Sequence, residues 1–422
     1  MRIIFLQNRL PIYLPKDKPY CIGMPYLNPY ISYFARIDYR TDKRLFGILQ
    51  HDRLFGMYLL GKTGSGKTNL MKTLIYQDII HRRGCCLFDI NGDLLMQVLK
   101  RIPEYRKKDI VYLDATNPNI ALGYNPLKKV GYEKRALIAS SILETFKKLW
   151  GQQSWGLKLE YILRNTLLTL LDQPQANFSD ISRLLLNKAF QQQCLHNIVS
   201  KQVIRFWELE FPKYSKADIL PVLNKVGSFL SIPILNRILV ENTVQISLRK
   251  IMDSKKIFLV NLSKGTLGTD GAHLLGSLLL SSLSSASFSR ITIEEKKRVP
   301  FFIYLDEFQN YTTVALATMF SELRKFKIGF VLAHQYLHQL QTDIKNAVLG
   351  NIGTILCFKL GQADAKYMAQ EFYPVFQISD FTHLAHFHVY LKLLINGKSP
   401  QAFSARTITL AELPYNTGDL SG

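Results

Sequence analysis

The sequence of 422 residues contains few cysteines, and these are scattered along the chain. The five cysteines form no Cys-x-x-Cys pair and no Cys/His cluster at metal-ligand spacing, which excludes a zinc ribbon. Their odd number and their scatter also argue against a disulfide framework. Reduced, buried thiols in a cytoplasmic protein are expected instead.

Long apolar runs are missing as well. The most apolar stretch, Leu274–Phe288, contains six serines and is shorter than the roughly 20 residues of a membrane span. It is therefore predicted to be a buried helix. Arg9, Pro11 and Pro15 interrupt the N-terminus, which argues against a signal peptide or an anchor there. We expect nothing in this chain to span a membrane.

Acidic side chains are outnumbered by basic ones, 32 against 53, which gives a formal net charge of +21. A polyanion is the first partner to expect, either nucleic acid or an anionic membrane face, and charge alone does not choose between them. Hydrophobic residues at 47% and charged residues at 20% predict a folded protein with a sizeable core.

Residues 61–68 read GKTGSGKT and fit the phosphate-binding pattern G-x-x-x-x-G-K-[ST]. The apolar run at 57–60 predicts a buried strand before it, and apolar residues at helical spacing predict a helix after it. Backbone N–H groups of such a loop face phosphate oxygens, and the helix N-terminus adds positive potential. Lys67 is predicted to reach the β- and γ-phosphates of ATP, and the Thr68 hydroxyl to bind Mg²⁺. The predicted nucleotide contacts are Gly61, Lys62, Thr63, Gly64, Ser65, Gly66, Lys67, Thr68 and Asn69.

Two further predicted strands end in polar residues that suit the same chemistry. Residues 301–307 read FFIYLDE, so that Asp306 is predicted to hold the Mg²⁺ shell and Glu307 to polarise the attacking water. The strand at 328–333 is followed by His334 and Gln335. Gln335 is predicted to contact the γ-phosphate, and His334 to be a packed or capping residue.

A tight turn follows the predicted strand that ends at Asp89. Asn91 and Gly92 are typical of such a turn, and Asp93 is predicted to cap the helix that comes next. A place for Asp89 near the nucleotide is the alternative to a purely structural role.

Seven segments together resemble the HerA/FtsK-type motors, and most of all the branch of type IV secretion and conjugation coupling proteins, the TraD/TraG DNA-binding ATPases. They are GKTGSGKT, FDINGDLL (88–95), GYNPL (123–127), NLSKGTLG (261–268), YLDEFQNY (304–311), AHQYLHQL (333–340) and GNIGT (350–354). The resemblance covers about residues 45–410. It implies a ring-shaped motor, usually a hexamer, that moves DNA at the expense of ATP.

The resemblance also implies a fold class and a division of the chain. The class is α/β, a RecA-like P-loop NTPase with a mostly parallel central sheet, an inserted all-α domain and a C-terminal antiparallel hairpin. The pattern of predicted elements agrees, because strands alternate with helices and then disappear between about 132 and 240. The expected parts are 1–131, the N-terminal segment and first part of the ATPase domain; 132–245, the all-α insertion; and 246–422, the second part.

In a ring motor an arginine from the neighbouring subunit completes the active site, and coupling proteins place it at a position matching Arg324. The alternative is that Arg324 only complements a helix C-terminus. Arg290 and Arg406 are weaker candidates.

The function expected from these observations is ATP-dependent translocation of DNA, mainly single-stranded and without sequence specificity. Relaxase and secretion-channel proteins are the further partners implied, with the membrane reached only through a partner at the inner face of the cytoplasmic membrane. One alternative is a soluble HerA-like DNA-processing helicase or packaging ATPase. Another is a protein-handling type IV secretion ATPase.

Overall fold

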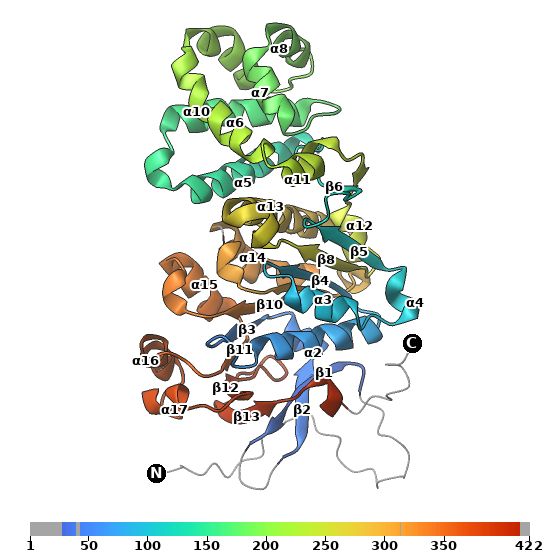
Figure 1. Cartoon of the computed structure of the whole chain (residues 1–422), viewed down its shortest axis with the longest axis vertical. Helices are drawn as coiled ribbons and strands as arrows, with labels where there is room; N and C mark the ends of the chain where they lie inside the picture. The colour runs from blue at the N-terminus through green and yellow to red at the C-terminus, as the bar shows by residue number, and fades with distance from the viewer. Residues whose placement is uncertain (1–27, 39–42, 313, 414–422) are drawn as a thin grey trace.

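The computed structural model describes residues 28–38, 43–312 and 314–413, and in them an 11-stranded sheet is the central element (Figure 1). Its order is β2-β1-β13-β12-β11-β3-β10-β9-β4-β8-β5. The strands are β1 Ile31–Ile37, β2 Leu45–Leu49, β3 Met57–Leu60, β4 Gly84–Asp89, β5 Ile110–Asp114, β8 Ile257–Asn261, β9 Phe301–Leu305, β10 Ile328–His334, β11 Thr354–Cys357, β12 His388–Lys392 and β13 Phe403–Thr407.

The helices fall into two groups, those that pack around the sheet and those that form a block at one end of the molecule. Around the sheet are α1 Gln50–Arg53, α2 Lys67–Ile80, α3 Asp93–Leu99, α4 Glu104–Lys107, α12 Leu248–Asp253, α13 Lys264–Phe288, α14 Val314–Glu322, α15 Thr342–Asn351, α16 Gln362–Glu371 and α17 Ile378–Thr382. The block contains α5 Tyr132–Trp150, α6 Leu157–Asp172, α7 Ser179–Leu186, α8 Lys188–Leu195, α9 Lys201–Arg205, α10 Lys216–Leu230 and α11 Pro233–Asn236.

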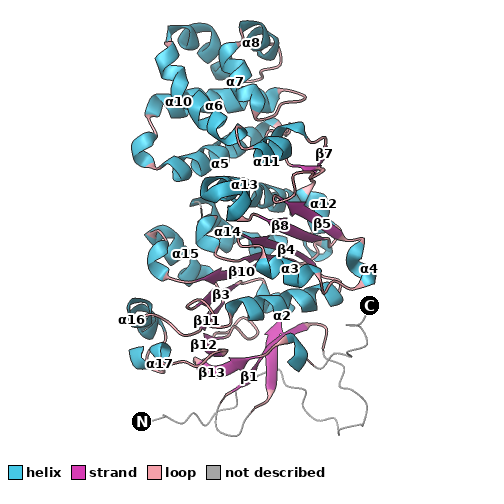
Figure 2. Ribbon diagram, in the orientation of Figure 1, coloured by secondary structure: helices cyan, strands magenta, loops and turns pink. Residues whose placement is uncertain are grey.

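Seven adjacent strands, from β11 to β5, run parallel, and they are the strands that the sequence predicted. Their side chains alternate between two apolar layers. Met57 and Leu59 pack in the layer that contains α2 and α3, whereas Tyr58 and Leu60 pack in the layer that contains α13. Figure 2 shows the helices that surround these strands. Because both faces are covered, these strands are apolar along their whole length. The predicted mostly parallel α/β sheet is confirmed.

The other end of the sheet is antiparallel. β12 and β13 form the predicted hairpin, in which Asn396 and Gly397 both have positive φ, 51° and 73°. Two positive φ values in a two-residue loop are typical of a type I′ turn. A second hairpin, β1–β2, was not predicted, and it pairs with β13. Almost every residue of β1 is buried, so the alternation that would identify a half-exposed strand is missing from its sequence.

Between residues 132 and 241 every regular element is a helix, and this helical block lies beyond α13 at one end of the molecule (Figure 1). Two short strands, β6 Leu122–Gly123 and β7 Val244–Gln245, pair in parallel where the chain enters and leaves the block. β7 lies at the end of 132–245, the range expected for the all-α insertion. One apolar core runs from the sheet through α13 into α5, so the separation of 132–245 as a domain stays a prediction.

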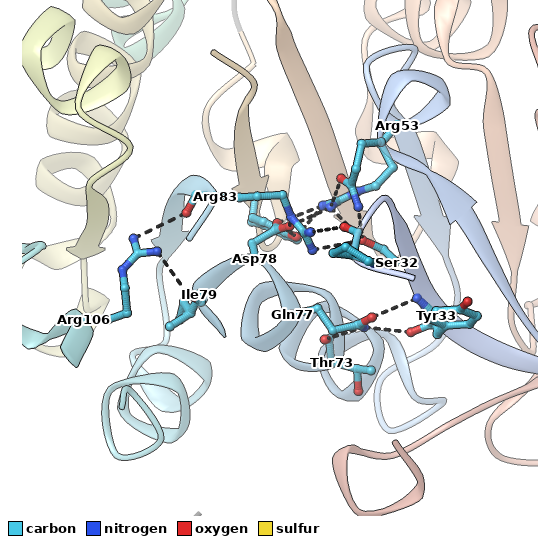
Figure 3. Close-up of polar contacts among 12 residues, drawn as sticks. Ser32, Tyr33, Arg53, Thr73, Gln77, Asp78, Ile79, Arg83 and Arg106 are labelled. Carbon is cyan, nitrogen blue, oxygen red and sulfur yellow. Dashed lines mark hydrogen bonds and ion pairs between the residues drawn. The ribbon is translucent and has the colours of Figure 1, made fainter. Parts of the chain in front are cut away.

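The face of the sheet that α2 covers contains a buried ionic network (Figure 3). The guanidinium of Arg53 donates two bonds to the Asp78 carboxylate, at 2.7 and 2.9 Å. Arg83 and the Tyr304 hydroxyl donate to the same carboxylate at 2.6 and 2.5 Å, and Arg53 also donates to Ser32 at 3.0 Å. The network therefore ties α1, α2, β9 and β1 together.

Within the described residues no single helix is long and apolar enough to span a membrane; by length and composition alone, only the pair 216–230 and 233–241, bent by 95°, passes that test. Cys85, Cys86, Cys194 and Cys357 are buried free thiols, and burial raises the pKa of each. Cys21 and the N-terminal residues 1–27 lie outside the described residues.

Candidate nucleotide-binding site

The predicted phosphate loop connects β3 to α2 at the carboxyl edge of the parallel strands. Gly66 precedes the helix with φ of 124°, and a Cβ there would lie 3.0 Å from the rings of Phe358 and Phe387. Only glycine fits that backbone in that space. The loop is fixed from outside by the N–H of Phe387, which donates to the Ser65 carbonyl at 3.0 Å.

Lys67 is the first residue of α2, and its side chain is 6% exposed. Its ammonium donates to the carbonyls of Gly61 and Lys62 at 2.5 and 3.0 Å. Burial lowers the pKa of Lys67, and the carboxylates of Glu307 and Asp306 act in the opposite direction. The ammonium is thus held inside the loop by the loop's own backbone.

The loop fits an anionic group. In the described part of the chain, the buried Ser65 hydroxyl has no hydrogen-bond partner, as expected where a ligand would supply one. Lys62, Thr63 and Thr68 are exposed at the loop surface. Asn69 differs from its neighbours, because its side-chain amide donates to the Ile408 carbonyl at 3.1 Å and so anchors α2 to the end of β13.

Asp306 follows the last residue of β9 and is 7% exposed. Burial raises its pKa to about 7, helped by the negative charges of Asp89 and Glu307, while Lys67 lowers it. Its carboxylate accepts the N–H of Glu307 at 3.1 Å. A cation bound at Asp306 would offset the repulsion that the neighbouring carboxylates exert on it.

Glu307 connects the acidic strand to the phosphate loop through side chains. One carboxylate oxygen accepts a short hydrogen bond from the Gln335 amide, and the other accepts the Gln309 amide at 2.8 Å. The oxygen of the Gln335 amide accepts the Thr63 hydroxyl at 2.9 Å. Thr63, Gln335, Glu307 and Gln309 therefore form one chain of hydrogen bonds, and the backbone of Glu307 is left-handed, with φ of 49°.

The turn after β4 is organised by Asp89 and not by Asp93. The carboxylate of Asp89 accepts the N–H groups of Asn91 and Leu95, both at 2.9 Å. Asp93 is already the first residue of α3. The residue at the N-cap position is Gly92, which has no side chain that could cap the helix. The prediction that Asp93 caps α3 was wrong, since the cap comes from the end of the preceding strand.

His334 is fully buried, and its Nδ1 lies 3.0 Å from the Tyr58 hydroxyl. Burial, and after it the charge of Lys67, lower its pKa to about 3. The ring is therefore neutral, and it is packed in the interior at the end of β10.

The candidate arginines lie in different places. Arg324 is exposed in the turn before β10, and its guanidinium lies 3.4 Å from the centre of the Phe55 ring. Phe55 precedes β3, so Arg324 lies at the amino edge of the sheet, opposite the phosphate loop of the same chain. Arg290 is wrong as a candidate because it is buried and donates to the carbonyls of Val299 and Phe326. Arg406 donates to Glu412 at 2.8 Å.

Two contributors to the site were missed by the sequence analysis. Gln309 reaches Glu307, and Lys148 of α5 donates to the Gln309 carbonyl at 3.3 Å and to the Thr312 hydroxyl at 2.8 Å. Gln309 follows the acidic pair closely enough to have been suspected. Lys148 is separated from that pair by about 160 residues of sequence, and only the packing of α5 brings it there.

Replacing Asp306 with asparagine is expected to stabilise the nucleotide-free protein at pH 8 by roughly 2–4 kcal/mol. The pKa of Asp306 is raised to about 7, so the folded state loses stability as pH rises from the unfolded pKa near 4 through 7. The asparagine carries no charge and keeps the oxygen that accepts the Glu307 N–H. Urea unfolding without Mg²⁺ at pH 4.5 and pH 8 measures the difference.

The control is Asp93→Asn, which removes an exposed carboxylate at the start of α3. It is expected to destabilise by less than about 1 kcal/mol, with little dependence on pH in this range. A gain for Asp306→Asn that is equal at both pH values would contradict the assigned cause.

Comparison with known proteins gives one family and a set of similar folds. The family model described as the type IV secretion-system coupling protein DNA-binding domain matches residues 50–373. The plasmid coupling protein TrwB bound to a non-hydrolysable GTP analogue superposes with a TM-score of 0.61 at 14% identity, covering 92% of this chain and 96% of that one.

TrwB with ADP and Mg²⁺ gives a TM-score of 0.62 at 13% identity, with 93% and 98% of the two chains covered. VirB4 of Thermoanaerobacter pseudethanolicus gives 0.62 at 13%, with 91% and 98% covered. Likeness at such identities establishes the fold. No curated protein matches the chain.

Proposed function

Because the chain belongs to the family of type IV secretion-system coupling protein DNA-binding domains, we propose that it is a coupling protein that moves DNA with energy from ATP hydrolysis. The observation that carries this proposal is the chain of hydrogen bonds from Thr63 of the phosphate loop through Gln335 to Glu307. It brings the groups that bind ATP and the groups that hydrolyse it to one edge of the sheet.

Each residue of the site has a part in the proposed reaction. Lys67 and the loop N–H groups bind the β- and γ-phosphates of ATP, and Thr68 with Asp306 would hold Mg²⁺, which neutralises phosphate charge. Glu307 orients the attacking water and accepts its proton, while Gln335 contacts the γ-phosphate. Each oxygen of Glu307 accepts one amide donor here and keeps a further lone pair, so the carboxylate can still accept a hydrogen bond from the attacking water.

The position of Arg324 supports a ring, which we propose to be a hexamer. At the amino edge of the sheet it cannot serve its own phosphate loop, but it can serve that of a neighbouring subunit, where such an arginine is worth about 10³–10⁵ in rate. Relaxase and channel proteins are the further partners proposed, together with a peripheral place at the inner face of the cytoplasmic membrane. Nothing in the described residues favours the DNA-processing or the protein-handling alternative.

Single-stranded DNA is expected to stimulate ATP hydrolysis several-fold at low salt. The net charge of +21 supports contacts to phosphates that do not depend on base sequence. For about six to ten such contacts, raising salt from 50 to 200 mM lowers affinity by roughly 10³–10⁵-fold, so the stimulation should disappear. A coupled ATPase assay, combined with particle mass in the presence of ATP and DNA, tests the motor and the ring together.

The control polymer is heparin at matched charge, which should not reproduce the stimulation by DNA. If the rate of ATP hydrolysis at low salt does not change when DNA is added, the proposed translocation of DNA is refuted. That result would favour the protein-handling alternative.

A further inference from the structure

The loop that follows Glu307 is held by side chains from two helices outside the acidic strand. From α5, the Lys148 ammonium donates to the Gln309 carbonyl and to the Thr312 hydroxyl. From α13, Lys264 and His273 contact the Asn310 side-chain oxygen, at 3.3 and 2.9 Å. Side chains of α5 and α13 therefore contact this loop in addition to the loop's own backbone hydrogen bonds.

The same loop fixes Glu307 in turn. The amide of Gln309 donates to the Glu307 carboxylate at 2.8 Å, and the amide of Asn310 donates to the Glu307 carbonyl at 2.7 Å. Gln309 thus carries both the contact to Lys148, through its backbone, and the contact to Glu307, through its side chain. A shift of Gln309 moves the carboxylate that polarises water.

Lys148 occupies a special position among these contacts, because it comes from the helical block. Both of its partners are uncharged oxygens, so the contact consists of hydrogen bonds from the ammonium and not of an ion pair. α5 packs on α13 within one continuous apolar core, which includes Leu143 and Phe146 of α5 and Leu279 of α13. Close-packed interiors transmit displacement, so a movement of the block is passed to the loop.

We propose that the helical block contacts DNA and that Lys148 is a positioning residue, which through Gln309 and Thr312 couples the position of the block to the orientation of Glu307. DNA bound to the block would then act on ATP hydrolysis by this route. The inference rests on the proposed function and adds the route by which the block would control it. Lys148 touches neither ATP nor water in this scheme, and its effect is exerted on the acidic side chain.

The test uses the full chain with four single variants, Lys148→Met, Lys147→Met, Thr312→Val and Thr312→Ser, and with the double variant of Lys148→Met and Thr312→Val. Lys148→Met should lower DNA-stimulated kcat about tenfold. This loss is smaller than the roughly 10²-fold loss that a misplacement of 1 Å can cause. KM for ATP should stay unchanged, since the interaction lost affects only the transition state. Thr312→Val should act in the same direction, and Thr312→Ser, which keeps the hydroxyl, should restore wild-type kcat.

Lys147 is the matched control, on the same helix, with its ammonium 3.8 Å from Glu160 and away from the loop. Lys147→Met should leave stimulation at the wild-type level. The double variant Lys148→Met with Thr312→Val should lose less than the product of the two single losses, because both substitutions remove the contact between Lys148 and Thr312. Thr312→Val removes in addition the bond from the Thr312 hydroxyl to the Gln309 carbonyl, at 3.1 Å.

Three results would each overturn the inference and leave the proposed function standing. They are a wild-type DNA-stimulated kcat in Lys148→Met, multiplicative losses of kcat in the double variant, and a rise in KM for ATP that accompanies the fall in kcat. If DNA stimulates ATP hydrolysis neither in the wild type nor in Lys147→Met, both the inference and the proposed function are overturned. Thr312→Ser keeps the test decisive if Lys148→Met fails to fold, because loss of stimulation in Thr312→Val without rescue by serine would also refute the contact.

Discussion

Lys67→Ala is expected to abolish ATP hydrolysis, lowering kcat by at least roughly 10²–10³-fold. The ammonium is buried at the start of α2 and bonded only to carbonyls of its own loop, so it lies where phosphates would take over those bonds. Alanine removes the charge that stabilises the developing negative charge on the phosphates. Phosphate release in a steady-state assay with excess Mg²⁺ and ATP measures the loss.

Lys72→Ala is the matched control on the same helix. Its ammonium donates to the Gln97 side chain at 2.9 Å, beyond the phosphate loop and on the face toward α3. Hydrolysis by that variant should equal the wild type. Retained activity in folded Lys67→Ala would show that the phosphates bind elsewhere, and the roles given to Thr68, Asp306 and Glu307 would then fail with it.

The part of the site that could be predicted from sequence is the part that short segments encode. GKTGSGKT supplies the glycine that the positive φ of Gly66 favours, so the segment can be recognised from its own residues. Asp306, Glu307 and Gln335 follow apolar strands, and parallel strands bring their carboxyl ends together at one edge. The residues at that edge were therefore predictable without any knowledge of how the helices pack.

What could not be predicted depends on contacts between segments far apart in the chain. The role of Lys148 exists only because α5 packs beside the loop after Glu307. The cap of α3 comes from Asp89 at the end of a strand, where the local rule pointed to Asp93. Arg290 looked like any basic residue at a helix end, and its burial is decided by the loop and turn that cover it.

Asp78→Ala is expected to lower the free energy of unfolding by about 3–5 kcal/mol. The carboxylate is fully buried and accepts bonds from Arg53, Arg83 and Tyr304, so its removal leaves two guanidinium groups without their counter-charge inside the protein. Burial alone would raise the pKa of Asp78, but the two arginines and the tyrosine lower it overall. Urea unfolding of wild type and variant measures the change.

The sign of that pKa shift makes the effect different from the effect at Asp306. A lowered pKa in the folded state means that Asp78 stabilises the protein above the unfolded pKa near 4 and loses this effect only in stronger acid. The cost of Asp78→Ala should therefore be equal at pH 6 and pH 8, whereas the gain from Asp306→Asn grows with pH across the same interval.

Glu104→Ala is the control for charge itself, because Glu104 forms an exposed ion pair with Lys107 and its side chain is 80% exposed. Removing that pair should change stability by at most about 1 kcal/mol. If Asp78→Ala cost no more than Glu104→Ala, the network of Figure 3 would contribute little to the fold. The attachment of β1 and α1 to α2 would then rest on apolar packing, for which the fully buried Phe34 and Phe46 are the candidates.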